Sequence, residues 1–165
     1  MSVFVEIVDL PAFHVVGINV TCPPQQLGAE IPEGWRILVS RLDEIPRRIN
    51  REQAFDIGVA QSELFTQCLA VQVESVAAVP SGMVSLMIPP RTYAVFNHNG
   101  PAKTISATYD SINAWFGNDS EYDIIPIPEA YGVDVYPIAL YTDQTLSRGP
   151  DSVITYQIRI PVKRK

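Results

Sequence analysis

The sequence holds few residues of the kinds that carry metal, nucleotide or nucleophile chemistry. Its two histidines are His14 and His98, and its two cysteines, Cys22 and Cys68, have no further ligand-type residue at metal-binding spacing. The glycines are isolated, so no phosphate-binding loop of the dinucleotide or Walker type is present. We expect no metal, no cofactor and two reduced thiols. A nucleophile–histidine–acid arrangement assembled across the fold stays open, because such triads are not visible in local sequence.

One carboxylate stands among apolar and aromatic neighbours. Glu129 lies within the segment Ile127 to Tyr131. In a pocket it would serve as a counter-ion or as a general base, because loss of water raises the pKa of a carboxyl group. An exposed turn between Pro128 and Gly132 is an equally good interpretation of the same residues.

Aromatic side chains are the other candidates for binding. The chain has seven tyrosines and two tryptophans, most of which we expect in the core. A buried tyrosine hydroxyl needs a hydrogen-bond partner, and rings that line a concave surface can stack on flat ligands or face cations. The aromatic residues gather around the expected helices and the strands of the second half: Trp35, Tyr93, Phe96, Tyr109, Trp115, Phe116, Tyr122, Tyr131, Tyr136, Tyr141 and Tyr156.

The charge balance excludes one class of partner. Twelve Lys and Arg against eighteen Asp and Glu give a net charge of −6, whereas a nucleic-acid-binding protein concentrates positive charge to replace counterions on phosphates. The first residues have no basic segment before an apolar run, and no apolar stretch is long enough to span a bilayer. We expect no direct nucleic-acid binding, no membrane insertion and a cytoplasmic location.

The elements that must position these residues follow from hydrophobic periodicity. Alternating and apolar runs predict strands over residues 3–8 and 13–20, and again over 55–60 and 64–74. Between these pairs an apolar stripe predicts a helix that begins near Trp35 and that Pro46 kinks or ends. The stripe consists of Trp35, Leu38, Leu42, Ile45 and Ile49.

The second half repeats this order. Pro90 follows Pro11 by 79 residues, and each proline separates two expected strands. A second helix is expected after Pro101, with strands over 124–127, 135–141 and 153–162 to follow. Its apolar stripe consists of Ile105, Tyr109, Ile112 and Phe116. We predict an α/β (α+β) fold of one domain, a duplicated strand–strand–helix–strand–strand unit (about 1–78 and 79–165) with a mainly antiparallel sheet, two helices and a pocket between the halves.

The chain resembles the GyrI-like small-molecule-binding domain, which also occurs as the effector-binding module of bacterial transcription regulators. The segments that carry the resemblance run through nearly the whole chain: IPEGW (31–35), LFTQCLAVQV (64–73), VPSGMVSLMIPPRTYAVFNHNGPAKTISATYDSINAWF (79–116), EYDIIPIPEAY (121–131) and IRIPV (158–162). The resemblance implies a duplicated α/β unit with a pocket between its halves. It also implies that Trp35, Tyr93 and Trp115 line that pocket.

The resemblance further implies an acidic residue in a Glu-x-Tyr pattern on a late strand, where it meets cationic ligands or acts in catalysis. Counted from the segment at 121, the pattern falls on Glu129 and Tyr131. Counted back from the terminal IRIPV, it falls on Ala139 and Tyr141, and the carboxylate is missing. Gln72 stands where relatives often carry Glu.

Three functions are compatible with this resemblance. The first is a stand-alone binding module for hydrophobic, aromatic or cationic compounds, with Trp35, Tyr93, Trp115 and Tyr141 as stacking surfaces and Glu129 as the charge. The second is a hydrolase of cyclopropanoid electrophiles that uses Glu129 and Tyr131. The third is an interaction protein with DNA gyrase or a regulator as its partner. Uncovered edge strands would also allow a homodimer.

Overall fold

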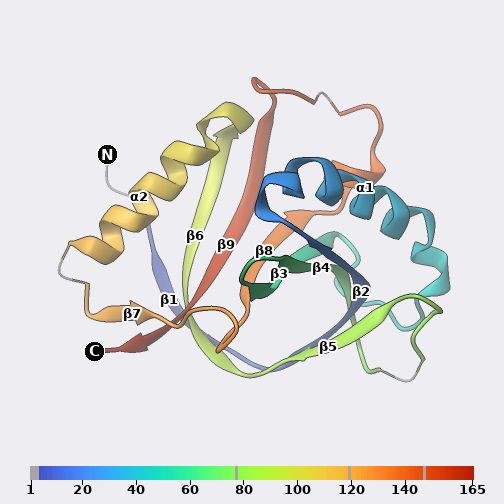
Figure 1. Ribbon diagram of the computed structural model, residues 1–165, viewed down its shortest axis with the longest axis horizontal. Coiled ribbons are helices and arrows are strands. Elements are labelled where there is room, and N and C mark those ends of the chain that lie inside the picture. Colours follow the sequence, from blue (N-terminus) through green and yellow to red (C-terminus); the bar gives the residue numbers. More distant parts are fainter. Residues whose placement is uncertain (1–3, 77, 119, 147) are drawn as a thin grey trace.

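The computed structural model describes residues 4–76, 78–118, 120–146 and 148–165 (Figure 1). These residues form nine strands and three α-helices, with single 3-10 turns at Pro24–Gln26, Leu42–Glu44 and Ala102–Thr104. The helices are α1 (Leu27–Ser40), α2 (Ile105–Gly117) and the short α3 (Ala139–Thr142). The strands are β1 (Glu6–Leu10), β2 (Phe13–Cys22), β3 (Gln53–Gln61), β4 (Phe65–Val73), β5 (Val84–Ile88), β6 (Arg91–Pro101), β7 (Tyr122–Ile124), β8 (Gly132–Pro137) and β9 (Val153–Arg164).

The sheet is antiparallel throughout and is symmetric about its centre. Its order is β1-β6-β9-β8-β3-β4-β2-β5, and β7 pairs with β9 outside this path. The first half of the chain supplies β3, β4 and β2, and the second half supplies the corresponding β8, β9 and β6. Each half also gives its first strand to the other, so β1 pairs with β6 and β5 pairs with β2. The predicted duplication and the α+β fold class are confirmed.

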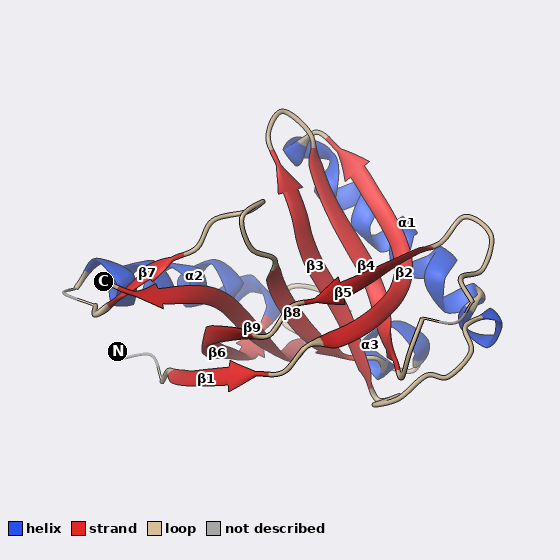
Figure 2. Ribbon diagram, turned by 90° about the horizontal axis from the view of Figure 1, so that it is seen from below, coloured by secondary structure: helices blue, strands red, loops and turns tan. Residues whose placement is uncertain are grey.

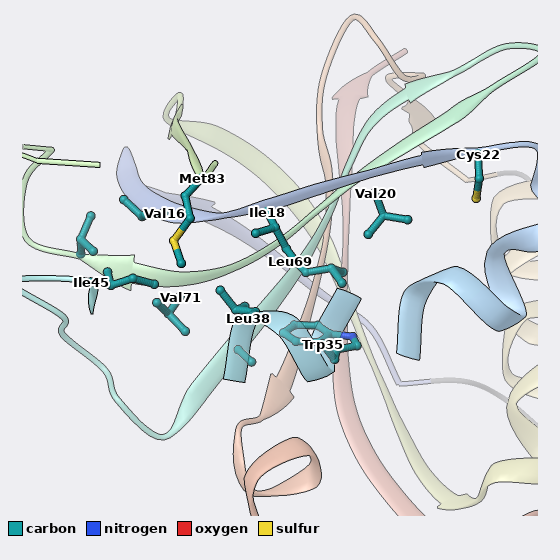
Figure 3. Packing of buried hydrophobic residues seen from close by; sticks show 12 residues of the cluster. Val16, Ile18, Val20, Cys22, Trp35, Leu38, Ile45, Leu69, Val71 and Met83 are labelled. Atoms are coloured by element: carbon teal, nitrogen blue, oxygen red, sulfur yellow. The ribbon is translucent and has the colours of Figure 1, made fainter. Parts of the chain in front are cut away.

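Both long helices cover the same face of the sheet (Figure 2). The core under α1 includes Trp35 and Leu38 of the helix with Leu69 of β4. Figure 3 shows these side chains together with Ile18 of β2. Under α2 the helix residue Ile112 and its neighbours pack on β6 and β9. One face of one sheet therefore carries two helices with a seam between them.

The first helix lies earlier in the sequence than its apolar stripe predicted. It spans Leu27–Ser40 and contains Pro32; this proline and Gly28, the residue four positions before it, are exposed, so solvent can hydrate the carbonyl that Pro32 leaves without a donor. After Ser40 the Arg41 backbone leaves the helical region, and a 3-10 turn follows. The prediction that the helix begins near Trp35 and continues to a kink or end at Pro46 was therefore wrong, although Ile45 still joins the core.

The second half agrees better with the sequence. The stripe of α2 packs into the core as predicted, although Pro101 ends β6 and α2 itself begins only at Ile105. The predicted strand over 135–141 was wrong in its second part. β8 ends at Pro137, Ile138 takes helical dihedral angles, and α3 follows. Among the described residues, no helix is long and apolar enough to cross a membrane.

Candidate ligand site between the two halves

The two halves meet along the pair β3–β8, which lies between α1 and α2 in Figure 1. In this antiparallel pair Ala54 faces Tyr136, Asp56 faces Asp134, and Gly58 faces Gly132. These six residues occupy every second position of their strands, so all of them lie on the same face of the sheet, which is the face that the helices cover.

Two carboxyl groups therefore lie opposite each other at the centre of the molecule. Burial raises the pKa of Asp56 to about 7. Burial, with a contribution from the Asp56 charge, raises the pKa of Asp134 to about 8. Gln67 of β4, with its amide nitrogen turned toward Asp56, donates to both carboxyl oxygens at 2.7 and 2.9 Å. Neither carboxyl forms a salt bridge with a basic side chain of the described residues.

The carboxyl groups border a cavity of about 450 Å³, which we call the carboxyl cavity. Glycine at positions 58 and 132 keeps this space open beside the two aspartates. A Cβ at Gly58 would lie 2.6 Å from the Ile127 side chain, so no larger residue fits there without displacing this wall. The lining residues used below are Asp56, Gly58, Gln67, Tyr109, Gly132 and Asp134.

A second cavity of about 770 Å³ lies beside α1, and we call it the aromatic cavity. Trp35 stacks on Tyr141 of α3 with 4.0 Å between ring centroids, and Tyr141 meets Tyr136 edge to face at 5.9 Å. All three residues line the cavity, together with exposed Arg36 and Arg148. Three rings thus form a continuous apolar wall.

A pair of stacked tyrosines lies between the two cavities. Tyr136 and Tyr156 stack at 4.5 Å, and the Tyr156 hydroxyl donates to the Tyr109 hydroxyl oxygen at 3.3 Å. Tyr136 belongs to the wall of the aromatic cavity and follows Asp134 by two residues on the same face of β8. Burial raises the pKa of Tyr109, Tyr136 and Tyr156, so these phenols stay neutral over the physiological range.

Comparison with known proteins identifies the family. The model of Cass2, described as integron-associated effector binding protein, matches residues 6–162. The chain belongs to this family of effector-binding proteins. The GyrI-like resemblance is confirmed with it.

One relative and two solved structures illustrate the similarity. The transcriptional regulator BrlR of Pseudomonas aeruginosa is 31% identical over 110 residues, which cover 65% of this chain and 39% of BrlR. The EcmrR C-terminal domain superposes over 100% of both chains, with a TM-score of 0.69 and 14% identity. SAV2435 bound to tetraphenylphosphonium covers 97% of this chain and 94% of its own, also with a TM-score of 0.69 and 14% identity. The two structural likenesses show the fold alone.

Two of the predicted site residues of this Cass2-family chain lie at the seam and four lie elsewhere. Trp35 and Tyr141 line the aromatic cavity. Glu129 is exposed, and its carbonyl accepts a 3.4 Å hydrogen bond from Arg91. The remaining three contribute to neither cavity: Tyr93 is buried in β6, Trp115 packs edge to face on Phe96, and Tyr131 packs in a core cluster with β3 and β8.

Sequence reasoning missed both aspartates of the seam. Between the two registers of the Glu-x-Tyr pattern, the sequence also has an aspartate two positions before a tyrosine, in Asp134-Val135-Tyr136. The sequence signal for this residue is an aspartate within a strand, with an apolar residue on each side of it. Asp56, between Phe55 and Ile57, gave the same signal in the first half. Among the described residues, no three His, Cys, Asp or Glu side chains gather as metal ligands would.

Proposed function

We propose that this domain captures lipophilic organic cations at the seam between its halves. The observation that carries the proposal is the Asp56–Asp134 pair, two carboxyl groups that line a cavity and form no salt bridge among the described residues. Both side chains are half-buried. A carboxylate that is largely removed from water and has no counter-ion is costly, and a cationic ligand removes that cost.

The aromatic wall supplies the second half of the recognition. Trp35, Tyr141 and Tyr136 line the aromatic cavity, and Tyr136 follows Asp134 by two residues on the same face of β8. A cation over the face of such a ring gains on the order of 1 kcal/mol. A ligand with a delocalised charge and aromatic substituents matches both features. Tetraphenylphosphonium, which SAV2435 binds in its reported structure, is of this type.

We further propose that capture serves as effector sensing inside the cell. The relatives are transcription regulators, and BrlR is longer than this chain, so a regulatory partner or further segment would receive the signal. Cys22 and Cys68 are both free and buried, as is usual in a reducing compartment, which favours the cytoplasm.

The test is a tryptophan-fluorescence titration at pH 8 with tetraphenylphosphonium and with neutral triphenylphosphine oxide. We expect saturable quenching by the cation that Trp35→Phe abolishes. Trp115→Phe is the matched control, because this tryptophan lines neither cavity, and it should retain the quenching.

Charge variants decide which carboxyl group acts. Asp134→Asn should weaken binding of the cation by about tenfold or more, close to 1.4 kcal/mol, and should change the affinity for the neutral compound little. Glu129→Gln removes the same charge at an exposed residue and should leave both affinities unchanged. A loss of cation affinity in Glu129→Gln but not in Asp134→Asn would favour the sequence-based assignment and contradict this proposal.

A further inference from the structure

We propose that cation capture at this site is a proton exchange: the empty Asp56–Asp134 pair holds a shared proton, and an organic cation that enters displaces it. The proposal rests on the proposed function, because it concerns the same cavity. It adds that the domain responds to pH and to ligand charge together.

The geometry of the β3–β8 pair carries the inference. Asp56 and Asp134 are direct partners in an antiparallel pair, and side chains at such positions have Cβ atoms about 5 Å apart on one face of the sheet. The next pair toward the cavity is Gly58–Gly132, so no side chain of these two strands separates the carboxyl groups from the open space. Both can approach the same ligand atom or the same proton.

Two negative charges at this spacing repel each other strongly away from water. The Gln67 amide can donate hydrogen bonds to Asp56 but adds no positive charge that would offset the repulsion. The pKa values of about 7 and about 8 belong to the pair, so near neutral pH it keeps at least part of one proton. A shared proton is the simplest way to leave one hydrogen-bonded negative charge in place of two.

The phenols and the thiol near the pair keep their protons over the same pH range. Burial raises the pKa of Tyr109 on α2, of Tyr136 on β8, of Tyr141 on α3 and of Tyr156 on β9. Burial also raises the pKa of Cys68 on β4, to about 12. One basic side chain of the described residues lines the carboxyl cavity, that of Arg159 on β9, and it donates to Gln157. His98 of β6 forms hydrogen bonds with Thr108 and Gly100 and lines neither cavity.

The class of ligand that the site binds then depends on the protonation state of the Asp56–Asp134 pair. A protonated carboxyl donates a hydrogen bond and suits a neutral ligand with an acceptor oxygen, whereas the ionised pair suits a cation. Raising the pH should therefore favour cations and disfavour neutral acceptor ligands at one and the same site.

The experiment is isothermal titration calorimetry of the full chain with tetraphenylphosphonium, which has no titratable group. At pH 7.5, titrations in phosphate and in Tris should give different heats, because the released proton is taken up by buffers of different ionisation enthalpy. We expect release of between half a proton and one proton. Affinity should rise with pH between 6 and 8, by up to about tenfold per pH unit, and level off above 9. Triphenylphosphine oxide should show the opposite trend.

One variant and one measurement without ligand distinguish failure of the proton exchange from failure of the proposed function. In Asp56→Asn the remaining carboxyl loses its like-charged neighbour, so the pH dependence should move to lower pH and proton release at pH 7.5 should fall. Carbon-detected NMR of the aspartate carboxyl groups reports the proton without any ligand. Cation binding with equal heats in both buffers and a flat pH profile would overturn the proton exchange and leave the proposed function standing. No cation binding at any pH from 6 to 9 would overturn both, and carboxyl signals that titrate near pH 4 would contradict the shared proton by themselves.

Discussion

Asp56 and Asp134 destabilise the fold at neutral pH, and the direction of the effect follows from their pKa values. An unfolded aspartate titrates near 4, roughly, whereas the folded groups titrate at about 7 and about 8. Between these limits the folded protein binds more protons than the unfolded chain does. The free energy of unfolding therefore falls as the pH rises from about 4 to about 8 and is level above that range.

Asp134→Asn should accordingly stabilise the protein at high pH. Its neutral amide removes the buried charge and can donate to Asp56, which faces it across the strands. We expect the free energy of unfolding at pH 8.5 to increase by on the order of 2 kcal/mol, and the difference to shrink at pH 5, where both folded carboxyl groups are protonated. Urea denaturation at the two pH values measures this, and Glu129→Gln should show no such pH-dependent gain. An Asp134→Asn protein that is less stable at pH 8.5 than at pH 5, relative to the parent chain, would contradict the assignment.

The residue scale also shows why the site was only partly predictable. The resemblance implies that Trp35, Tyr93 and Trp115 line a pocket, and of these three Trp35 alone lines one of the two cavities. Tyr141, which the second register of the Glu-x-Tyr pattern names, also lines the aromatic cavity. The pairing of Asp56 with Asp134 depends on the register between β3 and β8, which are about 80 residues apart. No local pattern specifies such a register, so the charge was assigned to Glu129, whose loop is exposed.

At the scale of the element, hydrophobic periodicity predicted which elements exist better than where they end. Ile45 and Ile49 continue the apolar spacing of α1, but the helix ends at Ser40 and both residues lie beyond it, after the 3-10 turn. Their spacing satisfied a helical period by coincidence. At 138–141 the apolar run predicts a strand, whereas Pro137 ends β8 and the chain forms the single turn of α3.

The packing of α1 on the sheet depends on one glycine, and this gives an element-scale prediction. A Cβ at Gly34 would lie 2.7 Å from Leu69 Cδ1 and 2.7 Å from Val20 Cγ2. Gly34→Ala should therefore push α1 off β2 and β4 and lower the free energy of unfolding by about 1–3 kcal/mol, in spite of the better helix propensity of alanine.

Gly28→Ala is the matched control in the same helix. No atom lies within 4 Å of a Cβ at this position, so alanine should raise the free energy of unfolding by up to about 1 kcal/mol. Thermal denaturation of both variants measures the pair of effects. If Gly34→Ala stabilised the protein as much as Gly28→Ala, the close approach of α1 to the sheet would be wrong.

At the scale of the whole molecule, the halves are symmetric but not independent. β1 of the first half closes the second half's sheet on β6, and β5 of the second half closes the first half's sheet on β2. The outer edges of β1 and β5 have no strand beside them within the described part of the chain. The predicted homodimer therefore stays a prediction, for which these edges are the available surfaces.

This exchange of edge strands predicts how the protein behaves when its halves are separated. A fragment of residues 1–78 lacks β5, which covers β2, and a fragment of residues 79–165 lacks β1, which covers β6. Each fragment also loses the β3–β8 pair at the seam, so core residues such as Phe55 and Val135 become exposed. We expect each fragment alone to be largely unfolded by circular dichroism. The two fragments mixed at equimolar concentration should recover the strand signal and elute together at the size of the intact chain.

Recovery should also restore quenching of Trp35 fluorescence by tetraphenylphosphonium, because the aromatic cavity takes Trp35 from one half and Tyr136 from the other. A single fragment that folds cooperatively and binds the cation by itself would show that the seam is not needed for the site.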